Sequence, residues 1–523
     1  MTTIKEHVKA MRGLIIAEIT ASFVASTAMS FIPLYNKLLV DEVLPQKGRH
    51  FLGLALLYLF TYLLYLLMTR IESRFSWKSG IRFENTLKKT CFDKMLHIPY
   101  TIFREKKPGE YLSLITNNIT QLEQDYLTPM VALIKSLFSV LVYAVIIAYA
   151  TSPLICAVLL ALSVLAAFSP KIYKKRLSAA GKAYVDEAAV YTKKVSDYLE
   201  GFDLLDRKTR KSFYRANAKI TDSLSGTRWK MGRLKVDGLL VSGGAILMIN
   251  VFVFLICGFL MLSGNITAGT VVAALTYAPA FADPLQEVLY DINTMHSTRG
   301  ILDALNGFLA FDPPEPEKAL PRESIVCSDL TVDFGRKKLR YNLELKMGEK
   351  YILCGLSGSG KTTLLNAVAG YVKYDGSLLL DGREKELDAD AYCFISQQQH
   401  VFSDDFASNV TLYGAYPVEE NRLCKLFGND ALFQRVRQSK DCSLLSGGEQ
   451  QAVKLCRMLA QEKPLVFLDE PFSALDRENE AALIANLNLL PSTVVMITHN
   501  PDIEGLENWV RINIQEVCHE ESA

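Results

Sequence analysis

A glycine-rich run in the second half of the chain has the composition of a phosphate-binding loop. It reads Gly355-Leu-Ser-Gly-Ser-Gly-Lys-Thr, follows a short apolar run and opens an apolar helical pattern. Glycines let backbone N–H groups curl around phosphate oxygens, and the helix that follows adds the positive end of its dipole. Lys361 would reach the outer phosphates, and the Thr362 hydroxyl would bind a magnesium ion. Strand, loop and helix together predict a P-loop, whose expected nucleotide contacts are Gly355, Ser357, Gly358, Ser359, Gly360, Lys361, Thr362 and Thr363.

A second run, Leu465-Val-Phe-Leu-Asp-Glu, is apolar and ends in two carboxylates. It is typical of a buried strand, on which neighbouring side chains point to opposite faces. Asp469 is therefore expected to hold Mg²⁺, directly or through water, while Glu470 orients or deprotonates the attacking water as a catalytic residue. Together with the P-loop upstream, this Walker B element predicts hydrolysis of ATP.

A third run, Leu445-Ser-Gly-Gly-Glu, lies between the first two and precedes a helical pattern. Such a helix start offers backbone N–H groups and a dipole to a second phosphate, although the P-loop already holds its own nucleotide. The run resembles the LSGGQ signature of ABC ATPases, with Glu449 in place of the final Gln. In that family the signature covers the ATP of the opposite subunit. The resemblance therefore implies a dimer, in which the partner's ATP is contacted by Ser446, Gly447, Gly448 and Glu449.

Four further positions match ABC ATPases in the expected order. Phe334 matches the aromatic residue that stacks on adenine, with a core phenylalanine as the alternative. Gln397 matches the Q-loop glutamine, which is a catalytic residue and a Mg²⁺ ligand in the family, with the next two glutamines as register alternatives. Asp476 matches the D-loop at the dimer seam, and His499 matches the catalytic switch histidine near the γ-phosphate.

The first 310 residues contain long apolar runs with few charges. These are 13–35, in which only Glu18 is charged, and 51–69, 136–170 and 238–282, which have no charge. About 20 apolar residues in a helix cross a bilayer, so the last two runs are long enough for two helices each. Turns are expected at Thr151-Ser152-Pro153 and at Ser263-Gly264-Asn265. The sequence therefore predicts six membrane spans.

The loops between these spans differ strongly in charge. The segments 70–127 and 171–235 hold ten and seventeen Lys or Arg residues, whereas the two later turns on the other side hold none. Because basic residues are retained in the cytoplasm, both termini and the ATPase domain are expected there, most simply in a bacterial cytoplasmic membrane. The basic segments are too long for ordinary loops and are predicted to be span helices extended into the cytosol.

One of these segments strengthens the resemblance. The stretch 97–118 resembles the first intracellular loop of exporter-type ABC transporters, which carries a coupling helix that docks on the ATPase. Asn117-Asn-Ile-Thr120 occupies the matching place, and Leu199–Leu205 matches the second coupling helix. One departure is Lys440-Asp-Cys-Ser-Leu, which replaces the Gly-Glu-x-Gly that usually precedes the signature. In the family that element contacts the partner's intracellular loop.

The composition agrees with a membrane part joined to a soluble part. Apolar residues make up 50% of the chain and charged residues 22%, and the formal net charge of +1 argues against a nucleic-acid partner. The ten cysteines include no C-x-x-C pair, so neither a zinc site nor a disulfide is expected. A proline-rich charged stretch follows residue 310, which places a membrane domain at 1–310, a linker at 311–324 and an ATP-binding domain at 325–523.

The predicted fold is a polytopic α-helical membrane domain of six spans with long cytoplasmic extensions, joined to an α/β P-loop NTPase domain of the ABC type. The resemblance implies an ATPase coupled to transport by alternating access, with ATP and Mg²⁺ as cofactors and a second half-transporter, identical or paralogous, as partner. A peptide, a lipid or a small amphipathic molecule is the expected export substrate. An importer with the exporter fold and an ATP-gated channel or sensor are the alternatives.

Three acidic residues of the predicted spans have more than one interpretation. Glu18 lies well inside the first span, so it marks either a functional site or a side chain that pairs with Arg12 or another neighbour. Asp283 and Glu287 are expected to mark the cytoplasmic stretch of the sixth span.

Overall fold

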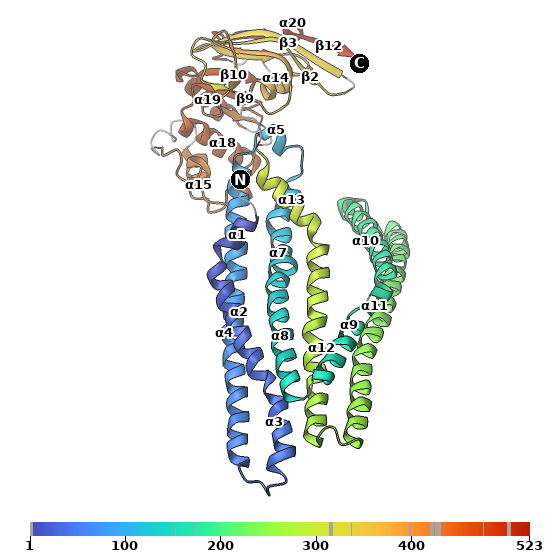
Figure 1. The fold of residues 1–523 in the computed structure, drawn as a ribbon. Helices are drawn as coiled ribbons and strands as arrows, with labels where there is room; N and C mark the ends of the chain where they lie inside the picture. Colours follow the sequence, from blue (N-terminus) through green and yellow to red (C-terminus); the bar gives the residue numbers. More distant parts are fainter. Residues whose placement is uncertain are drawn as a thin grey trace. The chain divides into compact units, whose positions relative to one another are not determined.

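The computed structural model of the chain describes residues 4–151, 153–169, 171–312, 317–335, 337–396, 399–418, 423, 430–473, 475–498 and 504–522. Two compact units divide the chain. The first, Met1–His97 with Pro108–Phe311, is helical, whereas the second, Ile98–Lys107 with Asp312–Ala523, combines helices with sheets (Figure 1).

The helical unit begins with two long apolar helices. The first is nearly continuous through α2 (Arg12–Ser30), α3 (Ile32–Leu38) and the π-helical turn η1 (Leu39–Val43), after a short α1 (Ile4–Ala10). The second, α4 (Phe51–Leu96), has 46 residues. At 1.5 Å per residue α4 is about 69 Å long, more than twice the roughly 30 Å of a bilayer core. A helix of this length has room for a span and for an extension beyond it, as the sequence predicts.

The rest of this unit is also helical. A third long helix runs through α6 (Pro108–Ser113), η2 (Leu114–Asn118), α7 (Ile119–Leu122), η3 (Glu123–Leu127) and α8 (Thr128–Ala150). It is followed by α9 (Pro153–Ala167), α10 (Lys171–Glu200), the 3-10 turn η4 (Phe202–Leu204), α11 (Thr209–Leu262), α12 (Ala268–Ser297) and α13 (Arg299–Ala310). The turn that follows α11 at 263–265 confirms the prediction for this position, and α8 and α9 end and begin on either side of the other predicted turn.

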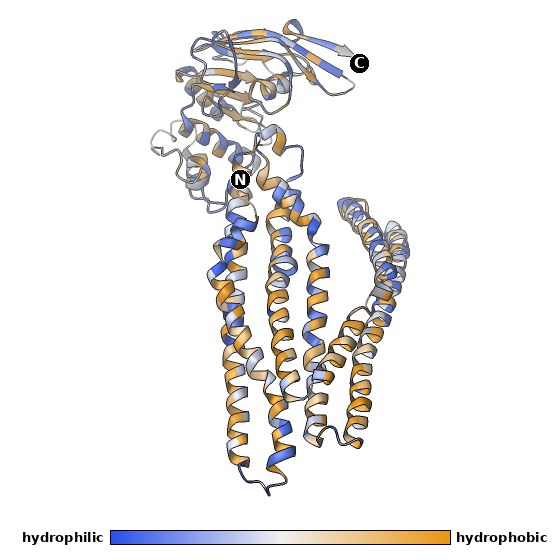
Figure 2. Cartoon of the chain, viewed as in Figure 1, coloured by the Kyte–Doolittle hydropathy of each residue, from blue (hydrophilic) through white to orange (hydrophobic). Residues whose placement is uncertain are grey.

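Four helical stretches of the described residues are long and apolar enough to cross a membrane. They are Arg12–Val43, Phe51–Leu96, Pro108–Ala150 and Thr209–Leu262, and a shorter apolar helix covers Pro153–Ala166. Figure 2 shows the apolar ends of α4 and α11 in orange, whereas α12 alternates blue and orange. The predicted sixth span corresponds to α12, which contains Asp283 and Glu287 and is not among these stretches. The count of six spans therefore stays a prediction.

Two apolar cores hold the helical unit together. One joins α8, α9, α11 and α12 around Tyr277 and Phe281, which are fully buried. The Tyr277 hydroxyl donates a hydrogen bond to the Ser30 carbonyl at 2.8 Å and so ties α12 to α2. The other core joins α1, α2, α4, α7, α8 and α13. In Figure 1, α10 and the first half of α11 form an arm that stands apart from α4 and α7.

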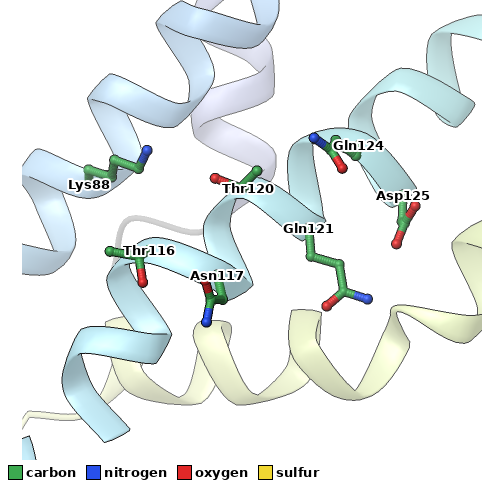
Figure 3. A pocket seen from close by; sticks show the side chains of 7 residues that line it. All are labelled: Lys88, Thr116, Asn117, Thr120, Gln121, Gln124 and Asp125. Carbon is green, nitrogen blue, oxygen red and sulfur yellow. The ribbon is translucent and has the colours of Figure 1, made fainter. Parts of the chain in front are cut away.

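The position expected for the first coupling helix was wrong. Asn117 and Thr120 lie within the continuous helix of the first unit, where they line a shallow polar hollow of about 460 Å³ beside Lys88 (Figure 3). The segment that belongs to the ATPase unit is instead Ile98–Lys107, which contains the short helix α5 (Tyr100–Phe103). The physical reason is that Pro99 and Pro108 flank this segment and interrupt the long helices there, whereas no helix breaker stands at 114–120.

Contacts within the second unit show how α5 is held. The rings of Tyr100 and Tyr371 lie 4.5 Å apart between centroids, and Tyr371 in turn packs against Tyr392 and Phe394. Glu105 forms an ion pair with Lys373 at 2.6 Å. An aromatic cluster of the ATPase unit therefore provides the docking surface for this segment.

A parallel sheet forms the centre of the second unit. Its strands, in the order β11-β4-β10-β9-β8, are Val510–Asn513, Lys350–Cys354, Thr493–Ile497, Leu465–Asp469 and Tyr392–Ile395. Every residue of β8, β9 and β10 is buried, as expected where helices cover both faces of a parallel sheet. The helices of this unit are α14 (Lys361–Val368), α15 (Phe406–Thr411), α17 (Asp430–Arg437), η5 (Cys442–Leu444), α18 (Gly447–Gln461), α19 (Arg477–Leu489) and α20 (Ile514–Val517).

An antiparallel sheet lies beside it. Its strands, in the order β12-β3-β2-β5-β6, are Cys518–Ser522, Lys337–Lys346, Ser324–Asp333, Asp375–Leu380 and Arg383–Glu384. A small parallel pair joins β1 (Lys318–Ala319) to β7 (Glu386–Leu387). The two large sheets share an apolar core that includes Tyr341, Leu353 and Phe467. The nine described cysteines are free thiols.

Candidate functional site: the nucleotide cradle

The P-loop connects the buried strand β4 to helix α14 through a tight turn. Gly358 and Gly360 adopt φ angles of +79° and +97°, which side chains other than glycine rarely allow. A Cβ atom at Gly360 would lie 2.6 Å from the Tyr341 hydroxyl, which donates a hydrogen bond to the Gly360 carbonyl at 2.9 Å. A Cβ atom at Gly355 would collide with Ile514. Packing from β3 and α20 therefore requires glycine at these positions and shapes the cradle.

Lys361 lies across the inside of this loop. Its ammonium group donates hydrogen bonds to the carbonyls of Gly355 and Leu356, each at 2.8 Å, and the residue is only 6% exposed. The buried Ser359 hydroxyl has no hydrogen-bond partner among the described residues. The loop thus offers a lysine ammonium group and a hydroxyl without a hydrogen-bond partner, and its glycine positions have no room for side chains. These features fit the binding of a phosphate chain.

Thr362 and Asp469 bring the first two motifs together. The Thr362 hydroxyl donates a hydrogen bond to Asp469 Oδ2 at 3.0 Å, from the first turn of α14 to the end of β9. Asp469 is buried, whereas Glu470 follows it in the left-handed region at φ +53°. The Glu470 N–H donates to the Ile497 carbonyl at 3.0 Å, which fixes this turn against β10. A hydroxyl and a carboxylate at this separation are oxygen ligands of the kind that Mg²⁺ prefers.

A cavity of about 320 Å³ opens over the loop. It brings together residues from both motifs and from the end of β2: Phe334, Lys337, Leu339, Ser357, Gly358, Gly360, Lys361, Thr362, Thr363, Glu470 and Ile497. The Phe334 side chain is 56% exposed, so it is not a core residue, and its ring is available for stacking. Lys337, Leu339 and Ile497 have no motif of their own and were not foreseen from the sequence.

The signature residues lie at the start of α18, outside the cavity over the P-loop. Ser446 caps α18, and its N–H and hydroxyl donate hydrogen bonds to Glu449 Oε2 at 3.0 and 2.7 Å, a capping box. The hydrogen bonds from Ser446 lower the pKa of Glu449, and Arg435 lies 3.8 Å from its other carboxylate oxygen. None of Ser446, Gly447, Gly448 or Glu449 lines the cavity of the P-loop.

Buried hydrogen bonds fix the signature helix to the loop after β8. Arg457 is 3% exposed and donates to the carbonyls of His400 and Asn409 and to the Asn409 side chain, at 2.8 to 3.0 Å. Asn409 also accepts a hydrogen bond from the Phe402 N–H at 2.8 Å. Asn409 was not singled out from the sequence, since its role depends on partners 7 and 48 residues away.

Three predicted positions remain. Gln397 and His499 lie outside the described residues, as does the register alternative Gln398. Asp476 caps α19 by accepting a hydrogen bond from the Asn479 N–H at 2.9 Å. The third glutamine, Gln399, donates to the Phe394 carbonyl at 3.1 Å.

The chain matches two family descriptions of known proteins. "ABC transporter transmembrane region" matches residues 15–285, and "ABC transporter" matches residues 339–473. The chain belongs to the ABC transporter family. It carries one membrane region and one ATPase region, so it is a half-transporter of the exporter type with an ATPase coupled to transport.

Relatives of this ABC transporter span nearly its whole length. An "ATP-dependent lipid A-core flippase" of Escherichia coli is 25% identical over 469 residues, 81% of this chain and 77% of the relative. "Transport/processing ATP-binding protein ComA" of Streptococcus pneumoniae is 21% identical over 521 residues, 93% of this chain and 71% of the relative. A bacterial Atm1-family ABC exporter with ATP bound has a TM-score of 0.78 at 15% identity, with 99% of this chain and 95% of the other covered. The last comparison supports the exporter fold.

Proposed function

We propose that this chain is one half of a dimeric ATP-hydrolysing exporter, in which each ATP is held by the P-loop of one subunit and the signature of the other. The main observation behind the proposal is that the P-loop and the signature of one chain do not line the same cavity. One cavity gathers the P-loop and Glu470, whereas the signature residues do not line it. A second half, identical or paralogous, would supply the missing signature.

The residues around the cavity have distinct proposed roles. Phe334 stacks on the adenine, and Lys361 exchanges its two carbonyl partners for phosphate oxygens. Glu470 orients or deprotonates the attacking water, since it lines the same cavity and is held by the turn against β10. His499 and Gln397 are proposed to complete the catalytic set.

Thr362 and Asp469 are proposed to hold Mg²⁺, with Gln397 as a third ligand. Bound there, the ion would neutralise charge on the phosphate oxygens. The oxygen atoms of Thr362 and Asp469 already lie 3.0 Å apart, so the two residues fit this role without rearrangement of α14 or β9.

The arm of the helical unit supports the proposed partnership. At its tip, the apolar side chains of Leu199, Phe202 and Leu204 are 66 to 69% exposed. Exposed apolar groups of this size favour an interaction surface. We propose that this tip is the second coupling helix, which contacts the ATPase domain of the partner.

The proposed site of action is a bacterial cytoplasmic membrane, with both termini and the ATPase domain in the cytoplasm. The basic segments 70–127 and 171–235 support this orientation. The proposed domain limits are 1–310, 311–324 and 325–523. Export of a peptide, a lipid or a small amphipathic molecule is proposed, because relatives named for lipid A-core flipping and for ComA transport and processing share the fold over most of the chain.

The test is ATP turnover by the purified chain in lipid nanodiscs, with its mass measured by light scattering. Glu470→Gln is the test variant, and Glu478→Gln, an exposed carboxylate on α19, is the control. Mg²⁺-dependent turnover by a two-subunit particle that Glu470→Gln abolishes supports a homodimer. An inactive monomer indicates a paralogous partner, to be co-purified next. Turnover that Glu470→Gln leaves unchanged contradicts the catalytic assignment.

A further inference from the structure

One face of helix α12 carries carboxylates in an otherwise apolar part of the bundle. Asp283 and Glu287 are one helical turn apart and both are exposed. The opposite face of the same helix is buried and consists of small and aromatic residues, among them Ala273, Ala274, Tyr277, Ala278 and Phe281. The helix therefore packs its apolar side into the unit and leaves its acidic side accessible.

The part of α12 up to Asp283 is shorter than a bilayer core, although the sequence predicts that Asp283 and Glu287 mark the cytoplasmic stretch of the sixth span. Asp283 follows 45 consecutive uncharged residues, 238–282, and lies 15 residues after the start of α12. At 1.5 Å per residue this is about 22 Å from the α11–α12 turn, less than the roughly 30 Å of a hydrocarbon core. Carboxylates at such depth are costly and are kept where they serve a function.

Within the part of the chain that the structure describes, no lysine or arginine forms an ion pair with Asp283 or Glu287. The single lysine of α8, Lys135, donates hydrogen bonds to Glu18 of α2 at 3.0 Å and to Glu72 of α4 at 2.9 Å. Glu287 instead accepts a hydrogen bond from the uncharged Ser136 at 2.8 Å. Three of the basic residues of α4 line a separate hollow that none of these carboxylates lines, namely Arg70, Arg74 and Lys78.

A buried carboxylate next to this face has unused hydrogen-bonding capacity. Asp291, one turn beyond Glu287, is only 5% exposed, and its Oδ2 atom has no hydrogen-bond partner among the described residues. Glu287 accepts from Ser136, and the adjacent Lys135 pairs with Glu18 and Glu72. Three carboxylates on α12, Asp283, Glu287 and Asp291, therefore lie on successive turns near one ammonium group that already has two carboxylate partners.

We propose that the exposed acidic face of α12 is a transport site for amphiphiles that carry a positive charge, with Asp283 and Glu287 as the carboxylates that receive an amine, guanidinium or onium group. The excess of fixed negative charge attracts a cation and repels an anion of the same size. The surrounding apolar helices accommodate the apolar remainder of the molecule. This inference rests on the proposed exporter function and names its substrate class.

The test compares two probes that differ mainly in the sign of their charge. Tetraphenylphosphonium and tetraphenylborate carry the same four phenyl groups around a cationic and an anionic centre. Binding of each is measured to the dimer in nanodiscs of uncharged lipid, after subtraction of binding to protein-free nanodiscs, and ATP turnover is measured on the same samples. We expect saturable, protein-dependent binding of tetraphenylphosphonium and none, or at least about tenfold weaker binding, of tetraphenylborate.

The variants locate the site. Asp283→Asn with Glu287→Gln keeps the side-chain shapes and removes both charges, so the dissociation constant for tetraphenylphosphonium is expected to rise about tenfold. Asp222→Asn, which removes an exposed carboxylate from α11, is the matched control and should bind as the unmodified chain does. If the double variant does not assemble, Asp283→Asn alone is compared with the same probes.

Two results would overturn the inference. One is equal or stronger protein-dependent binding of the anionic probe, and the other is an unchanged preference for the cation when Asp283 and Glu287 are neutral. Either result in a particle that hydrolyses ATP would leave the exporter proposal intact. Absence of ATP turnover in the unmodified dimer would count against the exporter proposal itself, whatever the probes show.

Discussion

The Thr362 hydroxyl donates its hydrogen bond to Asp469 Oδ2 across 3.0 Å, although 107 residues separate the two along the chain. One residue lies in the first turn of the helix after the P-loop, and the other ends a strand of the central sheet. The parallel pairing of β4 and β9 on either side of β10 places these two ends at the same edge of the sheet. The two oxygen ligands proposed for Mg²⁺ are thus positioned by the fold.

Asp469→Asn should weaken the dependence of turnover on Mg²⁺. An amide oxygen is a weaker ligand than a carboxylate, so we expect the half-activating Mg²⁺ concentration to rise about tenfold or more and maximal turnover to fall by about two orders of magnitude. The measurement is ATP turnover as a function of Mg²⁺ concentration, with a chelator as the zero point. Glu478→Gln is the control, because Glu478 is an exposed carboxylate of α19 and does not line the cavity. An unchanged Mg²⁺ response in Asp469→Asn would contradict the ligand assignment.

Phe334→Ala should weaken ATP binding without unfolding the domain. The ring is 56% exposed, so its removal leaves little cavity, whereas stacking on a base is worth about 1–3 kcal/mol. We expect the half-saturating ATP concentration to rise about tenfold and the melting temperature to stay within a few degrees. Phe334→Tyr keeps the ring and should restore binding. Equal ATP affinities in all three proteins would show that the ring does not contact the base.

The sequence predicted local motifs better than contacts between distant residues. The P-loop and Walker B elements and the turn at 263–265 follow from residue types a few positions apart, and the structure has them. The ABC fold was expected from the resemblance of the motifs to those of a family. Glu18 was expected to pair with Arg12 or another neighbour, and its observed partner is Lys135, 117 residues away. That contact depends on how α2 packs against α8. The spacing of residues along the chain does not indicate this packing.

The first coupling segment shows the same limit. Resemblance alone placed it at Asn117–Thr120, but Pro99 and Pro108 mark the interruption at which the chain leaves the long helices. The aromatic surface that receives it is built from Tyr371, Tyr392 and Phe394. These residues come from two separate parts of the chain and carry no motif.

Glu449→Gln should strengthen the response to ATP at low concentration. The Glu449 carboxylate accepts both the N–H and the hydroxyl of Ser446, the groups proposed to bind the partner's phosphate, and it would repel that phosphate. Glutamine removes this repulsion while its side-chain oxygen can still accept from Ser446, an effect of about 0.3–1 kcal/mol. We expect the half-saturating ATP concentration to fall about threefold. Glu478→Gln should leave it unchanged, and an increase in Glu449→Gln would contradict the proposed competition.

The same carboxylate predicts a pH dependence of stability. The hydrogen bonds from Ser446 lower the pKa of Glu449, so its folded value is below that of the unfolded chain. The cap therefore stabilises the fold above the ordinary Glu pKa and loses this effect as the pH falls through the lowered value. The difference in melting temperature between Glu449→Gln and the unmodified chain should be constant from pH 6 to 8. A difference that changes within this window would point to another group.

Tyr100→Ala should uncouple hydrolysis from transport. The Tyr100 ring packs against Tyr371 at 4.5 Å, and its loss removes this aromatic contact between α5 and the rest of the ATPase unit. We expect basal ATP turnover within about twofold of normal and loss of its stimulation by substrate, measured with tetraphenylphosphonium or a later identified substrate. Glu105→Gln is the control, because its ion pair with Lys373 is exposed and such pairs contribute about 0–1 kcal/mol. Retained stimulation in Tyr100→Ala would exclude α5 as the coupling element.

Gly269→Ala should destabilise the helical unit by forcing apart the ends of two helices. The Gly269 N–H donates to Asp41 Oδ1 at 2.9 Å, so the carboxylate of η1 caps the start of α12. A Cβ atom at Gly269 would lie 2.6 Å from the Lys37 carbonyl, a backbone atom that cannot rotate away. We expect a loss of about 1–3 kcal/mol, seen as a lower melting temperature in nanodiscs.

Gly258→Ala on α11 provides the matched control for that variant. A Cβ atom there meets nothing within 4 Å, so alanine should be neutral or stabilise the helix by up to about 1 kcal/mol. Asp41→Ala should reproduce the loss in Gly269→Ala, because both variants break the same cap. If Gly269→Ala and Gly258→Ala melted at the same temperature, the close approach of η1 to α12 would not contribute to stability. A loss in Gly269→Ala without one in Asp41→Ala would assign the effect to backbone packing against Lys37 instead of the cap.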